Sequence, residues 1–164
     1  EGNLIMLNAL STQPQILTPD FILNLLEVRA ALAPAYARMA FALSSQALVS
    51  VLEPLTRLPD SPEAFSRADQ DLHHQLTLLS GNPIFTLIYN GYRKLSYQAG
   101  LDYFAAPEAR ASSLDYYKGL LQDALSADAE SAANRTAKVM RESLEFWRKA
   151  SISHGREDET STNA

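Results

Sequence analysis

The sequence contains no cysteine, only three histidines and only six glycines among its 164 residues. The absence of cysteine excludes a disulfide framework, a cysteine-based zinc site and thiol chemistry, and it suits a reducing compartment. We also find no glycine-rich phosphate loop, no nucleophile elbow and no His-Glu-x-x-His pattern. Ser143 has no neighbouring base to activate it. We therefore expect a protein that is not an enzyme, with no catalytic residues and no cofactor.

Basic charge and long apolar runs are also scarce. The formal net charge is -5, which argues against a broad basic face that grips a nucleic-acid backbone. We see no signal peptide and no apolar run near the roughly 18 residues that span a bilayer. The 46% of hydrophobic residues is ample for the core of one domain. These features predict a soluble, cytoplasmic protein with no membrane partner.

Prolines and polar capping residues divide the chain into helices. Thr18 and Asn82 each precede a proline, an arrangement typical of helix starts because proline's missing N–H needs no partner there. Pro54 should kink or unwind a helix, and Gly81 should end one. The predicted helices begin near residue 1, Pro19, Ser45, Pro62, Pro83, Pro107 and Asp128. The pattern predicts an all-α fold, an antiparallel bundle of about seven helices enclosing a ligand cavity.

The stretch 83–104 is apolar around most of its circumference, which predicts a central helix surrounded by the others. Its inward positions should include Ile84, Leu87, Tyr92 and Leu95. Buried tyrosines need partners for their hydroxyls, so they either form hydrogen bonds within the core or face a cavity with a polar occupant. In the next helix Tyr116 and Tyr117 are adjacent, and we expect only one of them to face inward.

Arg29 falls on the apolar stripe of the first long helix, among residues such as Leu26. A charged side chain is tolerated there only if it snorkels, forms an ion pair in the core, or faces an anion. Ser143 and Trp147 share one face of the last helix, one turn apart, and Met140 completes that face. Together these residues indicate a pocket for a large, partly apolar, anionic ligand.

One pair of residues has metal-ligand spacing, since Asp69 lies one helical turn before His73. Metal sites normally draw three or more protein ligands, and the folded part of the sequence has no further histidine to complete one. We therefore predict no metal site.

Four stretches carry a resemblance to a known family. They are residues 25–29 (LLEVR), 79–84 (LSGNPI), 102–110 (DYFAAPEAR) and 141–147 (RESLEFW). Together they resemble the C-terminal effector domains of the FadR family, fatty-acid-responsive regulators within the wider GntR family. The resemblance implies a seven-helix effector domain over residues 1–152, followed by a disordered polar tail over 153–164. An N-terminal winged helix-turn-helix that dimerises and binds DNA, as in that family, is not recognisable in this chain.

The resemblance also implies a function and a ligand site. The implied ligand is long-chain fatty acyl-CoA, which would release a homodimer from operator DNA, so that the whole protein represses degradation genes and activates synthesis genes. The implied contacts are Leu26, Arg29, Tyr103, Tyr117, Ser143 and Trp147. Met140 replaces a glycine of the family pattern beside the ligand, and Ser96 replaces a tyrosine. Two alternatives stay open, a metal-dependent sensor of small carboxylates and a helical interaction module without a ligand.

Overall fold

The computed structural model describes residues 18–161, and it is all-helical over that range. Its elements are α2 (Pro19–Leu52), the 3-10 helix η2 (Glu53–Arg57), α3 (Pro62–Leu79), α4 (Pro83–Phe104), α5 (Pro107–Ser126) and α6 (Ala129–Ser161). The all-α prediction is confirmed, whereas the described residues form five α-helices rather than about seven. The short helix predicted near residue 1 lies outside the described residues.

The predicted helix starts agree closely with the structure, because each depends on a local hydrogen bond. The Thr18 hydroxyl accepts from the Phe21 N–H at 3.2 Å, and Asn82 Oδ1 accepts from the Ile84 N–H at 3.1 Å. Asp128 caps α6 in the same way. These side chains satisfy N–H groups that have no partner within the helix.

α2 consists of two helical segments joined at a kink. Ser44 has φ of -144° and ψ of 29°, and the Ser45 hydroxyl donates to the Phe41 carbonyl. The second segment thus begins where the sequence predicts a new helix. It ends at Leu52, where the chain tightens into η2 around Pro54, as predicted.

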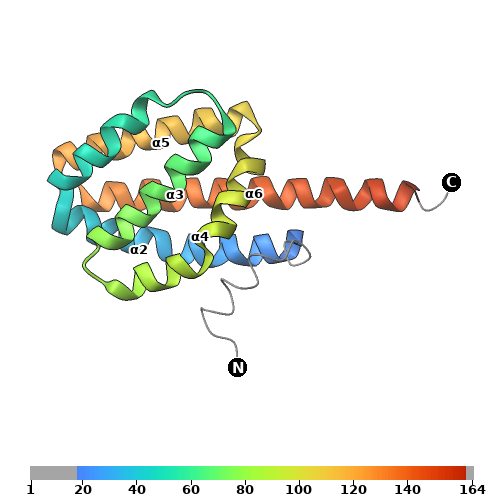
Figure 1. The fold of residues 1–164 in the computed structure, drawn as a ribbon, viewed down its shortest axis with the longest axis horizontal. Helices are drawn as coiled ribbons and strands as arrows, with labels where there is room; N and C mark the ends of the chain where they lie inside the picture. Colours follow the sequence, from blue (N-terminus) through green and yellow to red (C-terminus); the bar gives the residue numbers. More distant parts are fainter. Residues whose placement is uncertain (1–17, 162–164) are drawn as a thin grey trace.

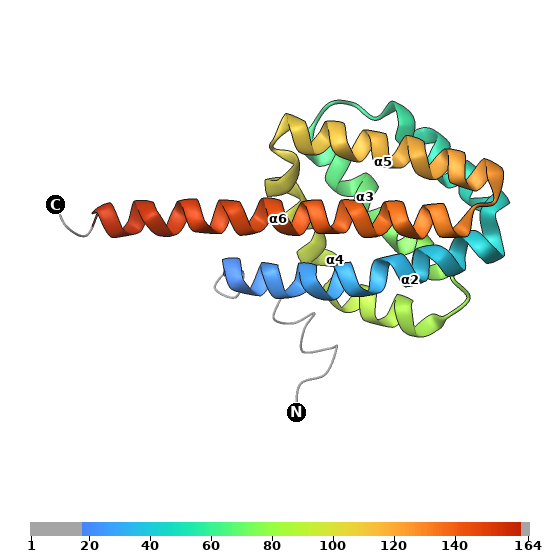
Figure 2. The same cartoon turned by 180° about the vertical axis from the view of Figure 1, so that it is seen from behind.

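The helices form two layers. The first segment of α2, α6 and α5 lie side by side with α6 in the middle, as Figure 2 shows. α3 and α4 cross the opposite face of this layer (Figure 1). α6 therefore contacts both α2 and α5 along its length, and α3 connects this layer to α4.

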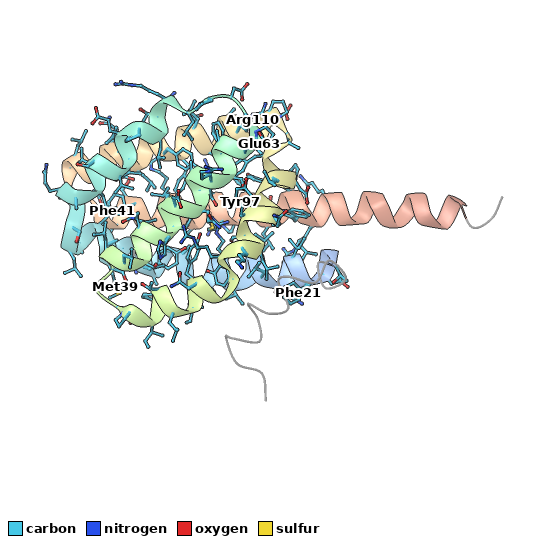
Figure 3. The ribbon with its side chains drawn as sticks, viewed as in Figure 1. Phe21, Met39, Phe41, Glu63, Tyr97 and Arg110 are labelled. Atoms are coloured by element: carbon cyan, nitrogen blue, oxygen red, sulfur yellow. The ribbon has the colours of Figure 1, made fainter. Side chains whose placement is uncertain are left out.

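The core lies between the layers, where side chains fill the interior (Figure 3). Its largest cluster centres on α2, with Tyr36, Phe41, Leu48 and Leu52 each at most 1% exposed. Residues of α3, α5 and α6 pack around them. A smaller cluster joins Ile22 and Leu26 of α2 to α4 and α6. The helix at the centre of the fold is therefore α2.

The prediction that the 83–104 helix is central is wrong. α4 packs mainly on α3, and its side chains Ile84 and Leu87 are 56% and 54% exposed. A wide apolar stripe shows which residues tolerate burial, but it does not show how many neighbours the helix has. The same limit explains Tyr116 and Tyr117, which are both buried because α5 has neighbours on two sides.

α6 differs from the sequence-based expectation at its C-terminal end. The helix continues to Ser161, over most of the stretch for which the sequence predicts a disordered tail, and it projects beyond the bundle in Figure 1. The stretch contains no proline to stop the helix.

One described segment, Asp20–Arg57, is long and apolar enough to span a membrane by length and composition alone. The expectation that no such stretch exists is therefore not met by this measure. Core helices of bundles pass the same test, and Ala33, Ala37 and Ala40 on this segment are fully buried against its neighbours.

Candidate functional site

A narrow cavity lies between the two layers, where α2, α3, α4, α5 and α6 meet. Its volume is about 30 Å³, which is room for about two water molecules. Pockets for drug-sized ligands are usually about 300–1,000 Å³. The predicted enclosure of ligand size is therefore not shown, and a large ligand must move the helices apart. The lining residues are Leu25, Leu26, Arg29, Asp69, Ser96, Ala99, Gly100, Tyr103, Phe104, Ser113, Tyr116, Val139, Met140, Ser143 and Trp147.

Most of the residues assigned to the ligand from the sequence lie around this cavity. Leu26 and Arg29 come from α2, Tyr103 from α4, and Ser143 and Trp147 from α6. Met140 also lines it and is 6% exposed, while Ser96, the other position that departs from the family pattern, faces it from α4. The structure thus brings together residues far apart in sequence, and their role in binding stays a prediction.

Tyr117 is the predicted site residue that does not line the cavity. It is fully buried and stacks on Phe65 with ring centroids 6.3 Å apart. Its neighbour Tyr116 lines the cavity instead, and the Tyr116 hydroxyl lies 3.0 Å from the Thr136 hydroxyl. Burial raises the pKa of both tyrosines, so both hydroxyls are protonated at neutral pH.

The polar part of the cavity wall is an ion pair between α2 and α3. Arg29 Nη2 donates to Asp69 Oδ2 at 2.5 Å, and the side chains are 9% and 14% exposed. Burial lowers the pKa of Arg29, but the charge of Asp69 more than offsets this and raises it overall. Of the two explanations for Arg29 that remain when it is buried, the structure contains the core ion pair.

His73 extends this pair into a longer polar chain. Its Nδ1 lies 2.6 Å from the Tyr36 hydroxyl, and its Nε2 lies 3.5 Å from Asp69 Oδ1. A ring nitrogen that faces a carboxylate favours the N–H form, so we assign the proton to Nε2 and the donated Tyr36 hydrogen bond to Nδ1. Burial, with the nearby charge of Arg29, lowers the pKa of His73 to about 3. The imidazole is therefore neutral.

Several buried polar atoms around this chain have no hydrogen-bond partner among the described residues. They are Arg29 Nε, His73 Nε2, Tyr92 Oη and Tyr117 Oη. Leaving such a group unpaired costs about 1–3 kcal/mol each. Buried polar atoms that stay unpaired call for an explanation, and one of these belongs to a residue of the cavity wall.

Within the described range, no group of three or more histidine, aspartate or glutamate side chains is placed to hold a metal ion. The Asp69 carboxylate is instead engaged by the guanidinium of Arg29. Sequence reasoning considered Asp69 only as a metal ligand and missed its place in the cavity wall. Its spacing from His73 was the available signal, but its partner lies 40 positions away in the chain.

These features define an all-helical domain whose polar and apolar side chains converge on one internal cavity. The chain belongs to the family described as the FadR C-terminal domain, which matches residues 1–154.

Curated relatives carry the name "Fatty acid metabolism regulator protein". That of Shewanella pealeana is 36% identical over 107 residues, which are 65% of this chain and 45% of the relative. That of Shewanella sp. (strain MR-4) is 39% identical over 102 residues, 62% of this chain and 42% of the relative. That of Enterobacter sp. (strain 638) is 33% identical over 129 residues, 79% and 54% of the two chains. The matches thus span about half the length of these relatives.

Proposed function

We propose that this chain is the ligand-sensing domain of a transcription regulator of fatty acid metabolism, and that its ligand is long-chain fatty acyl-CoA. Family membership and the names of the relatives support the regulator. The observation that supports the ligand is the cavity wall, which combines apolar residues such as Leu26 and Met140 with the polar groups of Arg29 and Ser143. An acyl chain with a polar head group needs both kinds of surface.

In the proposed mechanism the ligand acts by stabilising an opened arrangement of the helices. The cavity of about 30 Å³ is too small for an acyl chain, so binding must separate elements that are in contact here. A ligand shifts such an equilibrium only by its differential affinity for the two arrangements. Moving the population from 1:99 to 99:1 takes about 5.5 kcal/mol.

The rest of the proposal concerns the whole protein. It would be a cytoplasmic homodimer that reads DNA through a separate N-terminal domain, represses degradation genes and activates synthesis genes until acyl-CoA releases it from the operator. The domain described here would not itself bind DNA or catalyse a reaction.

The direct test is calorimetric titration of the 164-residue chain with palmitoyl-CoA at several temperatures. Burial of the acyl chain should give a negative heat-capacity change on binding. Ser143→Asn places a larger side chain in the cavity wall and should weaken binding by about tenfold, a change of about 1.4 kcal/mol. Ser50→Asn changes an exposed serine elsewhere on the surface and serves as the matched control.

Unchanged affinity in Ser143→Asn would remove the cavity from the proposal. Absence of any binding to the unmodified chain would contradict acyl-CoA as the ligand.

A further inference from the structure

The cavity contains two formal charges, and they cancel. Of its lining side chains, only Arg29 and Asp69 are charged at neutral pH, and they are paired to each other at 2.5 Å. The tyrosines of the wall are neutral, because burial raises the pKa of Tyr103 to about 12 and that of Tyr116 still further. The nearby His73 is neutral as well. The wall is therefore polar but has no net charge.

A ligand that brings its own charge into this wall meets opposing effects. A carboxylate attracted by Arg29 would be repelled by Asp69 at nearly the same distance, so the net Coulomb gain is small. It would still lose its hydration, a cost of several kcal/mol per ion in a protein interior. An uncharged carbonyl group avoids most of this cost.

The wall also offers a hydrogen bond that suits an uncharged acceptor. Arg29 is 7% exposed, and its Nε–H has no partner among the described residues. The Asp69 pairing uses Nη2 and leaves this donor free. A carbonyl oxygen can accept from it without disturbing the ion pair, and it would satisfy a buried donor that is otherwise unpaired.

We propose that Asp69 is a specificity-determining residue, which neutralises Arg29 so that the cavity selects an uncharged ester or thioester carbonyl over a free carboxylate. This inference rests on the proposed function, because it assumes that an acyl ligand enters this cavity. It differs from the assumption that Arg29 serves as a free cation for an anionic ligand. The carboxylate that determines the selection comes from α3, and no ligand contact was assigned to that helix from the sequence.

The test compares ligands that share one chain length and differ only in the head. These are dodecanoyl-CoA, methyl dodecanoate, dodecanoate and dodecylamine. Binding to the 164-residue chain is followed by the fluorescence of Trp147, the single tryptophan of the sequence, which lines the cavity. The unmodified protein should bind the thioester and the ester, and should bind dodecanoate about tenfold or more weakly than the methyl ester.

Two variants reverse the charge balance in opposite directions. Asp69→Asn leaves Arg29 uncompensated and should strengthen dodecanoate binding by about tenfold while changing ester binding little. Arg29→Gln leaves Asp69 uncompensated and should admit dodecylamine, which the unmodified protein rejects. If Asp69→Asn does not fold, Arg29→Gln with the amine still tests the same charge argument. Asp71→Asn removes a more exposed carboxylate of the same helix, paired with Arg93, and is the matched control.

The possible failures are distinguishable. If the unmodified protein binds dodecanoyl-CoA but the folded variants keep its ligand preference, the role of Asp69 is refuted and the proposed function stands. If the unmodified protein binds dodecanoate as well as the ester, Asp69 does not select against carboxylates. If no acyl compound binds to the unmodified protein, the proposed function fails, and this inference fails with it.

Discussion

Two arginine–aspartate pairs in the described part of the chain have a largely buried carboxylate, and they differ in how completely their atoms are satisfied. Asp123, 7% exposed, accepts from the Ser131 hydroxyl at 2.8 Å and from Arg135 Nε at 2.9 Å, and Arg135 itself is 37% exposed. Arg29 and Asp69 are both buried, and Arg29 Nε is unpaired. The first pair joins α5 to α6 and is complete. The second lies at a cavity and is not.

This difference shows how a structural ion pair can be distinguished from a candidate functional one. A pair whose purpose is to hold helices together gains from every hydrogen bond it can form and from partial access to water. A pair that keeps a buried donor unsatisfied lowers stability, and such sites are common where a ligand binds. The predictions below test this distinction.

The largest expected effect is that of Asp69→Ala. The substitution leaves the Arg29 guanidinium buried without a counter-charge, which should lower the free energy of unfolding by about 3–5 kcal/mol. Asp123→Ala should cost only about 1–3 kcal/mol, because Arg135 can turn toward water. Urea denaturation of both variants measures the difference. The double variant Arg29→Met/Asp69→Leu should recover most of the loss, and equal costs for the two single variants would contradict the distinction.

Acid should act on the buried pair at the cavity through His73. The pKa of His73 is about 3 in the folded protein, against an ordinary value of 6.5 for a free histidine side chain, so the unfolded state takes up a proton first as the pH falls. The free energy of unfolding should therefore decrease by about 1.4 kcal/mol per pH unit below pH 6.5, down to the folded pKa. Denaturation between about pH 7 and pH 4.5 measures this slope.

His73→Asn should flatten that slope, since asparagine can still accept from Tyr36 but does not titrate. His74→Asn is the matched control. His74 is a neighbour on the same helix that is much more exposed, and burial lowers its pKa too. A slope that persists in His73→Asn would assign the acid sensitivity to other groups.

The pair between Asp123 and Arg135 depends on a glycine. The Arg135 side chain crosses α5 at Gly119, where an added Cβ would overlap its guanidinium. Gly119→Ala should displace Arg135 from Asp123 and cost about 1–2 kcal/mol, partly offset by a gain in helix propensity of about 1 kcal/mol. In an Arg135→Ala background the same change should stabilise the protein, by about 1 kcal/mol. A double-mutant cycle measured by thermal denaturation separates the two terms.

The smallest effect concerns the turn that leads into α6, next to the pair between Asp123 and Arg135. Ala127 ends α5 in the left-handed region with φ of 54°. This conformation costs a residue with a Cβ about 1–2 kcal/mol, and glycine adopts it freely. Ala127→Gly should therefore raise the free energy of unfolding by about 1 kcal/mol in urea denaturation. A loss of stability would show that the turn is not strained.

Much of the fold was predictable because its signals are local. Thr18, Asn82 and Asp128 cap helices through hydrogen bonds to N–H groups two or three residues away, and Pro54 disrupts its own helix. Such interactions depend on neighbours in the sequence. The inward position of Arg29 was predictable for the same reason, since helical periodicity places it among apolar residues.

The remaining features depend on how the helices cross. The pairing of Arg29 with Asp69 requires α2 and α3 to meet at one point, and no local pattern encodes that crossing. The exposure of Ile84 and the place of Tyr116 in the cavity wall depend likewise on which helices lie beside α4 and α5. Six of the seven predicted site residues line the cavity, and Tyr117 does not.

The length of α6 gives the cavity a mechanical advantage. The helix carries Met140, Ser143 and Trp147 at the cavity and continues to Ser161 beyond the bundle. At 1.5 Å per residue, the part after Trp147 extends about 21 Å. A tilt of about 5° at the cavity would therefore displace its far end by about 2 Å if the helix stays straight. α6 is thus a lever whose short arm lies in the wall of the cavity and whose long arm reaches outside the bundle (Figure 1).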